Sequence, residues 1–276
     1  MTPPAPVAST IPNKYASLRL VDHLDKGGVF DPKFTALVRG PIPSNIDPDG
    51  TSYDFDYAGL TFAINAQFQA LNLVASPYYL IDVCLLHASE TNEIAAEQTS
   101  SPRTPISASS TCGTRTAPRR ASSRPTLRSA QSPARTFDSW LPEPLVARIE
   151  QVRQWLESPS PQPELPSVVV YVHCDGGCDR TGEMIGAYLL RFPKLTWEQM
   201  YATNIPCGRP FGCNNYRAVQ WYAYYLNYAL GYSIVDIGYD GGCYDGPSNA
   251  GFGPDTGETY PLGAIHFCRP APYAGS

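Results

Sequence analysis

The sequence lacks most of the patterns that mark membrane, nucleic-acid-binding and zinc-binding proteins. No apolar run reaches about 18 residues, so we expect no transmembrane segment. Its 20 Lys and Arg are outnumbered by 25 Asp and Glu, and the formal net charge of −5 gives no support for nucleic-acid binding. The first ten residues carry neither a basic segment nor a long apolar core, so they do not resemble a secretory signal peptide.

The spacing of the eight cysteines and four histidines does not resemble that of metal ligands. No two cysteines are separated by only two residues, and the histidines do not cluster near them. We therefore predict no metal and no cofactor.

The length of 276 residues suits one sizeable core, and 28 Pro with 22 Gly predict many loops. We expect a flexible tail over 1–14, one domain over 15–235, and a glycine-rich appendage over 236–276. Within the domain, residues 98–136 hold seven Arg and no acidic residue among many Ser, Thr, Pro and Ala, so we predict that they are disordered. This insert is either a basic loop able to contact anionic membranes or accept phosphate groups, or an artefact of gene prediction.

The sequence pattern of the domain predicts an α/β fold. Apolar, β-branched runs predict buried strands over 78–86, which includes Cys84 as a core residue, and over 168–172. Helical spacing of apolar residues predicts helices over 60–73, over 145–157, from about 181, and over 216–230. Thr196 and Gln199 match a capping box at the start of one more helix. A helix followed by a strand ahead of the 168–172 strand favours a parallel sheet.

The segment between the 168–172 strand and the next helix has the features of an anion site. It starts at Cys174, contains Gly176 and Gly177, and ends at Arg180. A tight loop that enters a helix N-terminus directs backbone N–H groups and the positive end of the helix dipole at one point. The arginine fork can hold two phosphate oxygens, and a cysteine thiol in such surroundings ionises more readily than a free thiol.

The residues His173-Cys174-x5-Arg180-Thr181, with Gly177 and Gly182, resemble the signature of the cysteine-based protein tyrosine and dual-specificity phosphatases. The resemblance covers about 25 residues of the 276. It implies a central, mostly parallel sheet flanked by helices, with the loop at the end of a strand. It also implies a substrate that is a phosphomonoester and a thiophosphate intermediate.

The same resemblance implies roles for the loop residues. Cys174 would attack phosphorus, Arg180 would bind the equatorial oxygens, and Thr181 would stabilise the departing thiolate. His173 would help to set the ionisation of Cys174. The positions in between would line the bound phosphate: Asp175, Gly176, Gly177 and Cys178.

Two aspartates are candidates for the general acid. Asp138 precedes the 145–157 helix, as the acid does in this family, although the usual Trp-Pro-Asp order is absent. Asp138 would serve equally well as a helix cap. Asp179 is similar to the aspartate of myotubularin and Sac-type phosphoinositide phosphatases, whose loops read Cys-x4-Asp-Arg-Thr. That likeness implies an acid or a water-orienting base inside the loop, and an inositol phosphate substrate. The charges of Asp175 and Asp179 oppose a polyphosphate substrate.

Three more residues have two interpretations each. Cys178 would either form a protective disulfide with an oxidised Cys174 or simply pack. Arg209 and Asn215 match an Arg-x5-Asn loop of dual-specificity phosphatases that positions substrate and water, or they cap the tyrosine-rich helix that follows.

From the resemblance we expect a phosphatase that acts on phosphoproteins in preference to phosphoinositides. The alternative from another class is a phosphate-binding module without turnover. Sulfurtransferases of the rhodanese kind also use a cysteine loop, but the Arg-Thr-Gly start of the helix is a poor match to them. A catalytic thiolate favours a reducing compartment, so we expect a cytoplasmic protein. In an oxidising lumen, Cys243 and Cys268 of the tail would be able to pair.

Overall fold

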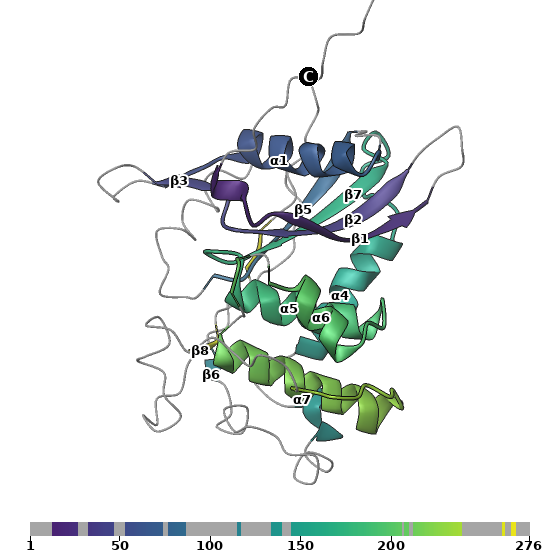
Figure 1. Ribbon diagram of the computed structural model, residues 1–276. Helices are drawn as coiled ribbons and strands as arrows, with labels where there is room; N and C mark the ends of the chain where they lie inside the picture. Colours follow the sequence, from purple (N-terminus) through teal and green to yellow (C-terminus); the bar gives the residue numbers. More distant parts are fainter. Residues whose placement is uncertain are drawn as a thin grey trace, which may run out of the picture.

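The computed structural model describes residues 13–26, 33–46, 53–73, 77–86, 115–116, 134–139, 145–205, 207–209, 212–238, 261–262 and 266–268. A central sheet carries helix α1 on one face and helices α4, α5, α6 and α7 on the other (Figure 1). This arrangement confirms the predicted α/β class.

The main sheet has five strands in the order β1-β2-β7-β5-β9. Its three inner strands are parallel, and both edge strands are antiparallel to their neighbours. The sheet is therefore mixed, and the expected mostly parallel order holds only for its centre. The bounds are β1 Arg19–Asp25, β2 Phe34–Gly40, β7 Ser167–His173, β5 Tyr78–Cys84 and β9 His266–Cys268.

The inner strands are apolar because both of their faces are covered. All seven residues of β2, of β5 and of β7 are buried. Alternation along β7 sends Val168, Val170 and Val172 into the core beneath α4, α5 and α7. It sends Val169 and Tyr171 into the second core beneath α1.

The helix predicted over 145–157 is confirmed at both ends, and the other predicted helices are present with a shifted start or end. The capping box at α6 is confirmed, because Gln199 N–H donates to Thr196 Oγ1 at 3.2 Å and Thr196 N–H donates to Gln199 Oε1 at 3.0 Å. The bounds are α1 Tyr57–Ala70, α4 Leu145–Glu157, α5 Asp179–Arg191, α6 Trp197–Thr203 and α7 Cys213–Leu230. Short elements complete the description: η1 Asn13–Tyr15, β3 Ser44–Ile46, β4 Tyr53–Phe55, β6 Arg115–Thr116, η2 Phe137–Ser139 and β8 Pro261–Leu262.

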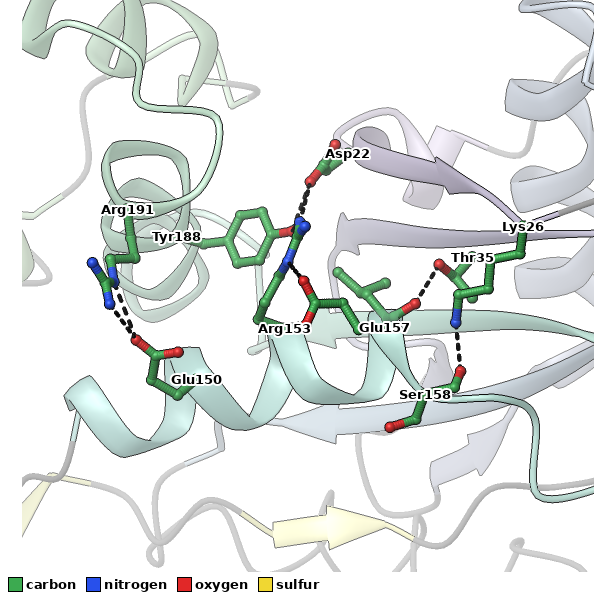
Figure 2. A network of polar contacts seen from close by, with 10 residues as sticks. Asp22, Lys26, Thr35, Glu150, Arg153, Glu157, Ser158, Tyr188 and Arg191 are labelled. Carbon is green, nitrogen blue, oxygen red and sulfur yellow. Dashed lines mark hydrogen bonds and ion pairs between the residues drawn. The ribbon is translucent and has the colours of Figure 1, made fainter.

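A polar network attaches α4 and α5 to the sheet (Figure 2). The Tyr188 hydroxyl of α5 donates to Asp22 Oδ2 of β1 at 2.6 Å and accepts from Arg153 of α4 at 3.2 Å. At the end of α4, Lys26 donates to Ser158 O at 2.5 Å. These contacts hold the helices from the side of β1.

Two segments differ from their predicted character. In the insert, Arg115–Thr116 pairs with Pro261–Leu262, and Ala134 is fully buried in the main core. In the tail, His266–Cys268 adds the edge strand β9 to β5. Both pairings join residues far apart in the chain, so a local sequence pattern does not predict them. The rest of the predicted disorder, and Cys243 of the predicted tail disulfide, lie outside the described residues.

Candidate functional site: the loop between β7 and α5

Cys174 lies directly after β7, at the carboxyl edge of the parallel strands, where α/β proteins commonly bind ligands. Its thiol is not disulfide-bonded, and the residue is only 3% exposed. Residues 174–178 lead from β7 to α5, which begins at Asp179. Together with the first two residues of α5 they form what we call the 174–180 loop. The predicted strand–loop–helix geometry is thus confirmed.

The 174–180 loop rests on the chain that leaves β2. Gly177 has φ +68°, and a Cβ atom there would lie 2.3 Å from Gly40 O and 2.7 Å from Pro41 N. Ile42 N–H donates to Asp175 O at 2.8 Å. Only glycine combines this backbone conformation with this close approach, which explains the glycine that the phosphatase-like signature contains.

A buried arginine that sequence reasoning missed lies beneath the loop. Arg39 of β2 is 1% exposed, and its guanidinium donates to Gly177 O at 2.7 Å and to Asn204 Oδ1. Burial lowers the pKa of Arg39 to about 10, against the opposing effect of nearby Cys174. The side chain is therefore a cation at neutral pH. In the sequence it is a single charged residue directly after the mostly apolar run of 34–38.

His173 contacts a second buried residue that sequence reasoning missed. Its Nε2 lies 3.1 Å from Asp82 Oδ1 of β5, at ion-pair distance but without the alignment of a good hydrogen bond. Both side chains are at most 1% exposed. Nδ1 of His173 lies 3.4 Å from Cys174 O. Asp82 thus contacts the histidine that precedes Cys174. In the sequence it is the one carboxyl in a strand of otherwise apolar residues.

The first turn of α5 carries the two other signature residues. Arg180 is half-buried there. Thr181 is fully buried, and its hydroxyl has no hydrogen-bond partner within the described part of the chain. A buried hydroxyl without a partner is uncommon in native proteins, and the Thr181 hydroxyl is thus able to donate to a ligand or a reacting group.

Asp179 is held in a bidentate pair. Arg209 donates through both terminal nitrogens to the two carboxylate oxygens at 2.9 Å each, and Gly212 N–H donates to Oδ1 at 2.6 Å. Burial alone would raise the pKa of Asp179, but these hydrogen bonds and the charges of Arg209 and Arg180 hold that pKa below its ordinary value. Asp179 is thus an ionised anchor, and the predicted role as proton donor does not fit this state.

Cys178 is bonded to Cys207, which lies between α6 and α7. The alternative of a protective Cys174–Cys178 pair does not describe this state, because the Cys178 sulfur is already used. Cys213 is also disulfide-bonded. The two residues expected to bind substrate from this region have structural partners: Arg209 contacts Asp179, and Asn215 Nδ2 donates to Glu183 Oε2 of α5 at 2.7 Å.

Asp138 is not brought to the loop. It is exposed on η2, where the adjacent Phe137 ring packs against Tyr225 of α7 at a centroid distance of 6.0 Å. Tyr225 lies ten residues after Asn215, which is roughly 15 Å along α7. Asn215 is the residue of α7 that contacts Glu183 in the first turns of α5. In the described part of the chain no hydrogen bond or ion pair joins Asp138 to the 174–180 loop, and its role as general acid stays a prediction.

Neither a metal nor a membrane span is indicated by the described residues. They contain no group of three or more His, Cys, Asp or Glu side chains able to hold a metal ion. None of the helices described is both long and apolar enough to cross a membrane. Comparison of this chain with family models, with curated proteins and with solved structures finds no match.

Proposed function

We propose that the chain is a cysteine-dependent phosphomonoester hydrolase that acts on phosphorylated proteins. The observation that carries the proposal is the arrangement around the 174–180 loop. A buried, unbonded thiol at Cys174 precedes a helix whose first turn holds Arg180 and the buried Thr181 hydroxyl, which has no partner among the described residues.

In the first step, the Cys174 thiolate attacks phosphorus. A sulfur–phosphorus bond forms, and the bond from phosphorus to the ester oxygen breaks with its electron pair on the leaving oxygen. Backbone N–H groups of the loop and the Arg180 guanidinium stabilise the charge on the three equatorial oxygens. Arg39, a buried cation, holds the loop in place through its hydrogen bond to Gly177 O.

In the second step, water attacks the phosphorus of the thiophosphate. The sulfur–phosphorus bond breaks, inorganic phosphate leaves with the oxygen of the water, and the thiolate is regenerated. The Thr181 hydroxyl then donates a hydrogen bond to the departing sulfur, which provides the partner that it otherwise lacks.

Aryl phosphates are the substrates that this arrangement supports best. Asp179 is ionised and held by Arg209, and Asp138 makes no hydrogen bond or ion pair with the loop in the described part of the chain, so we assign the role of proton donor to neither. A phenolate departs with less need of a proton than an alkoxide. Phosphotyrosine on protein is therefore preferred to phosphoserine, phosphothreonine or phosphoinositides. The phosphoinositide likeness depended on Asp179, which serves here as an anchor.

The proposal is tested by hydrolysis of an aryl phosphate and of a phosphotyrosine peptide. Cys174→Ser should abolish turnover, and Arg180→Lys, which keeps the charge but loses the planar fork, should lower kcat/KM roughly a hundredfold. Cys84→Ala removes another buried cysteine and should retain turnover, so it controls for loss of a thiol.

Vanadate, an analogue of the phosphoryl group, separates turnover from binding. Wild-type protein that binds vanadate without hydrolysing any phosphomonoester would be a phosphate-binding module, and the proposal would be wrong. Faster release of phosphate from phosphoinositide vesicles than from the phosphotyrosine peptide would overturn the substrate preference.

A further inference from the structure

The loop between α6 and α7 is attached to the 174–180 loop by a covalent bond and by a bidentate ion pair. Cys207 is bonded to Cys178, and Arg209 binds Asp179, the next residue of the chain. Gly212 N–H adds a third contact, to the same carboxylate. We call these three contacts the clamp. It joins the last residue of the loop proper and the first residue of α5 to a segment about 30 residues further along the chain.

We propose that the Cys178–Cys207 disulfide is a positioning bond of the candidate site, so that the site works with Cys174 reduced and Cys178 oxidised. This inference rests on the proposed function. It gives two cysteines of one loop opposite redox states. A reductant would then disable the site, whereas a phosphatase with only a catalytic cysteine is protected by a reductant.

The clamp fixes the end of the loop at Cys178 and Asp179, whereas residues of and after β2 fix Asp175 and Gly177. On the sheet side, Arg39 donates to Gly177 O and Ile42 N–H donates to Asp175 O. Cys178 is the N-cap residue of α5, and its side chain makes no capping hydrogen bond. The disulfide therefore constrains the backbone at the point where N–H groups of the helix must converge on a phosphate.

The clamp also removes a competing thiol. If Cys178 were reduced, its thiol would lie four residues from the nucleophile, where oxidation would be able to join the two. In the disulfide, the Cys178 sulfur is not available, and Cys174 is buried except for 3% of its surface. The bonded state of Cys213 agrees with an environment in which disulfides persist. The proposed working compartment is therefore oxidising, in contrast to the cytoplasm that we expected from the thiolate alone.

The test uses the full chain, purified without reductant, and two readouts. One is kcat/KM for an aryl phosphate. The other is the rate at which iodoacetamide alkylates Cys174, with and without inorganic phosphate, followed by peptide mass mapping. A dithiol reagent then reduces Cys178–Cys207: the reagent gives two electrons and two protons, the cysteines become thiols, and the reagent becomes a cyclic disulfide.

Reduction should lower kcat/KM roughly tenfold to a hundredfold, in step with the appearance of alkylated Cys178 and Cys207 in the peptide map. It should also remove the protection of Cys174 by inorganic phosphate. The double variant Cys178→Ala/Cys207→Ala leaves no new thiol beside Cys174 and keeps Cys213 bonded. It should show the low kcat/KM without any reductant, and the reductant should change it little.

The outcomes separate this inference from the proposed function. Full turnover in the double variant, or in wild-type protein whose Cys178–Cys207 bond is shown to be open, would overturn the clamp and leave the hydrolase standing. A protein that shows no turnover, but in which reduction abolishes the protection of Cys174 by inorganic phosphate, would support the clamp and overturn the proposed hydrolase activity. If the double variant does not fold, as judged by circular dichroism, the reduced wild type alone decides.

Discussion

Replacement of Gly177 by alanine should disable the 174–180 loop more than any other one-methyl change. The new Cβ would lie 2.3 Å from Gly40 O, and an ordinary van der Waals contact begins at about 3.4 Å. The difference of 1.1 Å must come from movement of the loop or of the backbone at Gly40 and Pro41. The positive φ of 68° adds roughly 1–2 kcal/mol of strain for a residue with a Cβ.

A displacement of this size has a predictable kinetic effect. Misplacement of reacting groups by about 1 Å typically costs on the order of a hundredfold in rate. We therefore expect Gly177→Ala to lower kcat for an aryl phosphate about a hundredfold, with a loss of at least about 1–2 kcal/mol in the free energy of unfolding in urea. The kcat measurement is made at saturating substrate, so that weaker binding does not enter.

The neighbouring glycine supplies the matched control. Gly176 is exposed, and a Cβ added there would meet only the Cys178 sulfur, at 3.5 Å. Gly176→Ala adds the same methyl group to the same loop without a close contact, so it should lower kcat at least about tenfold less than Gly177→Ala does. Equal losses in the two variants, or a Gly177→Ala protein with normal kcat, would show that the close approach to Gly40 does not position the loop.

Two further predictions concern charges beside the loop. Arg39→Met should cost about 2–4 kcal/mol of unfolding free energy, because it leaves two buried oxygens, Gly177 O and Asn204 Oδ1, without a donor. Arg39→Lys keeps the charge and one donor group and should lose less, so equal losses of the two variants in urea titrations would contradict the role of the guanidinium contacts. The pKa of Asp179 is lower in the folded protein than in the unfolded chain, where it is about 3.9. The ionised carboxylate therefore stabilises the fold at pH values above about 3.9, and this stabilisation is lost as the pH falls through the folded-state pKa. Asp179→Asn should therefore lose stability at pH 7 and show a smaller further loss between pH 5 and pH 3 than wild type; an unchanged acid dependence in urea titrations would refute the ionised pair.

The local elements of the site follow from the sequence by itself. A β-branched run, a glycine-containing loop and helical spacing after Arg180 correctly predicted β7, the 174–180 loop and α5. The capping box of α6 was equally local, since its two partners are three residues apart. Short-range sterics and hydrogen bonds determine such elements, so a window of a few residues contains the necessary information.

Only the tertiary structure decided which distant side chains surround Cys174. Arg39 reaches Gly177 across 138 positions of the chain, and Cys207 is bonded to Cys178 across 29. Asp82 meets His173 because β5 and β7 are neighbours in the sheet, and η2, which carries Asp138, packs against α7 through Phe137. Strand order and helix packing bring these residues together or keep them apart, and they depend on burial of the whole core, which no short stretch of sequence specifies.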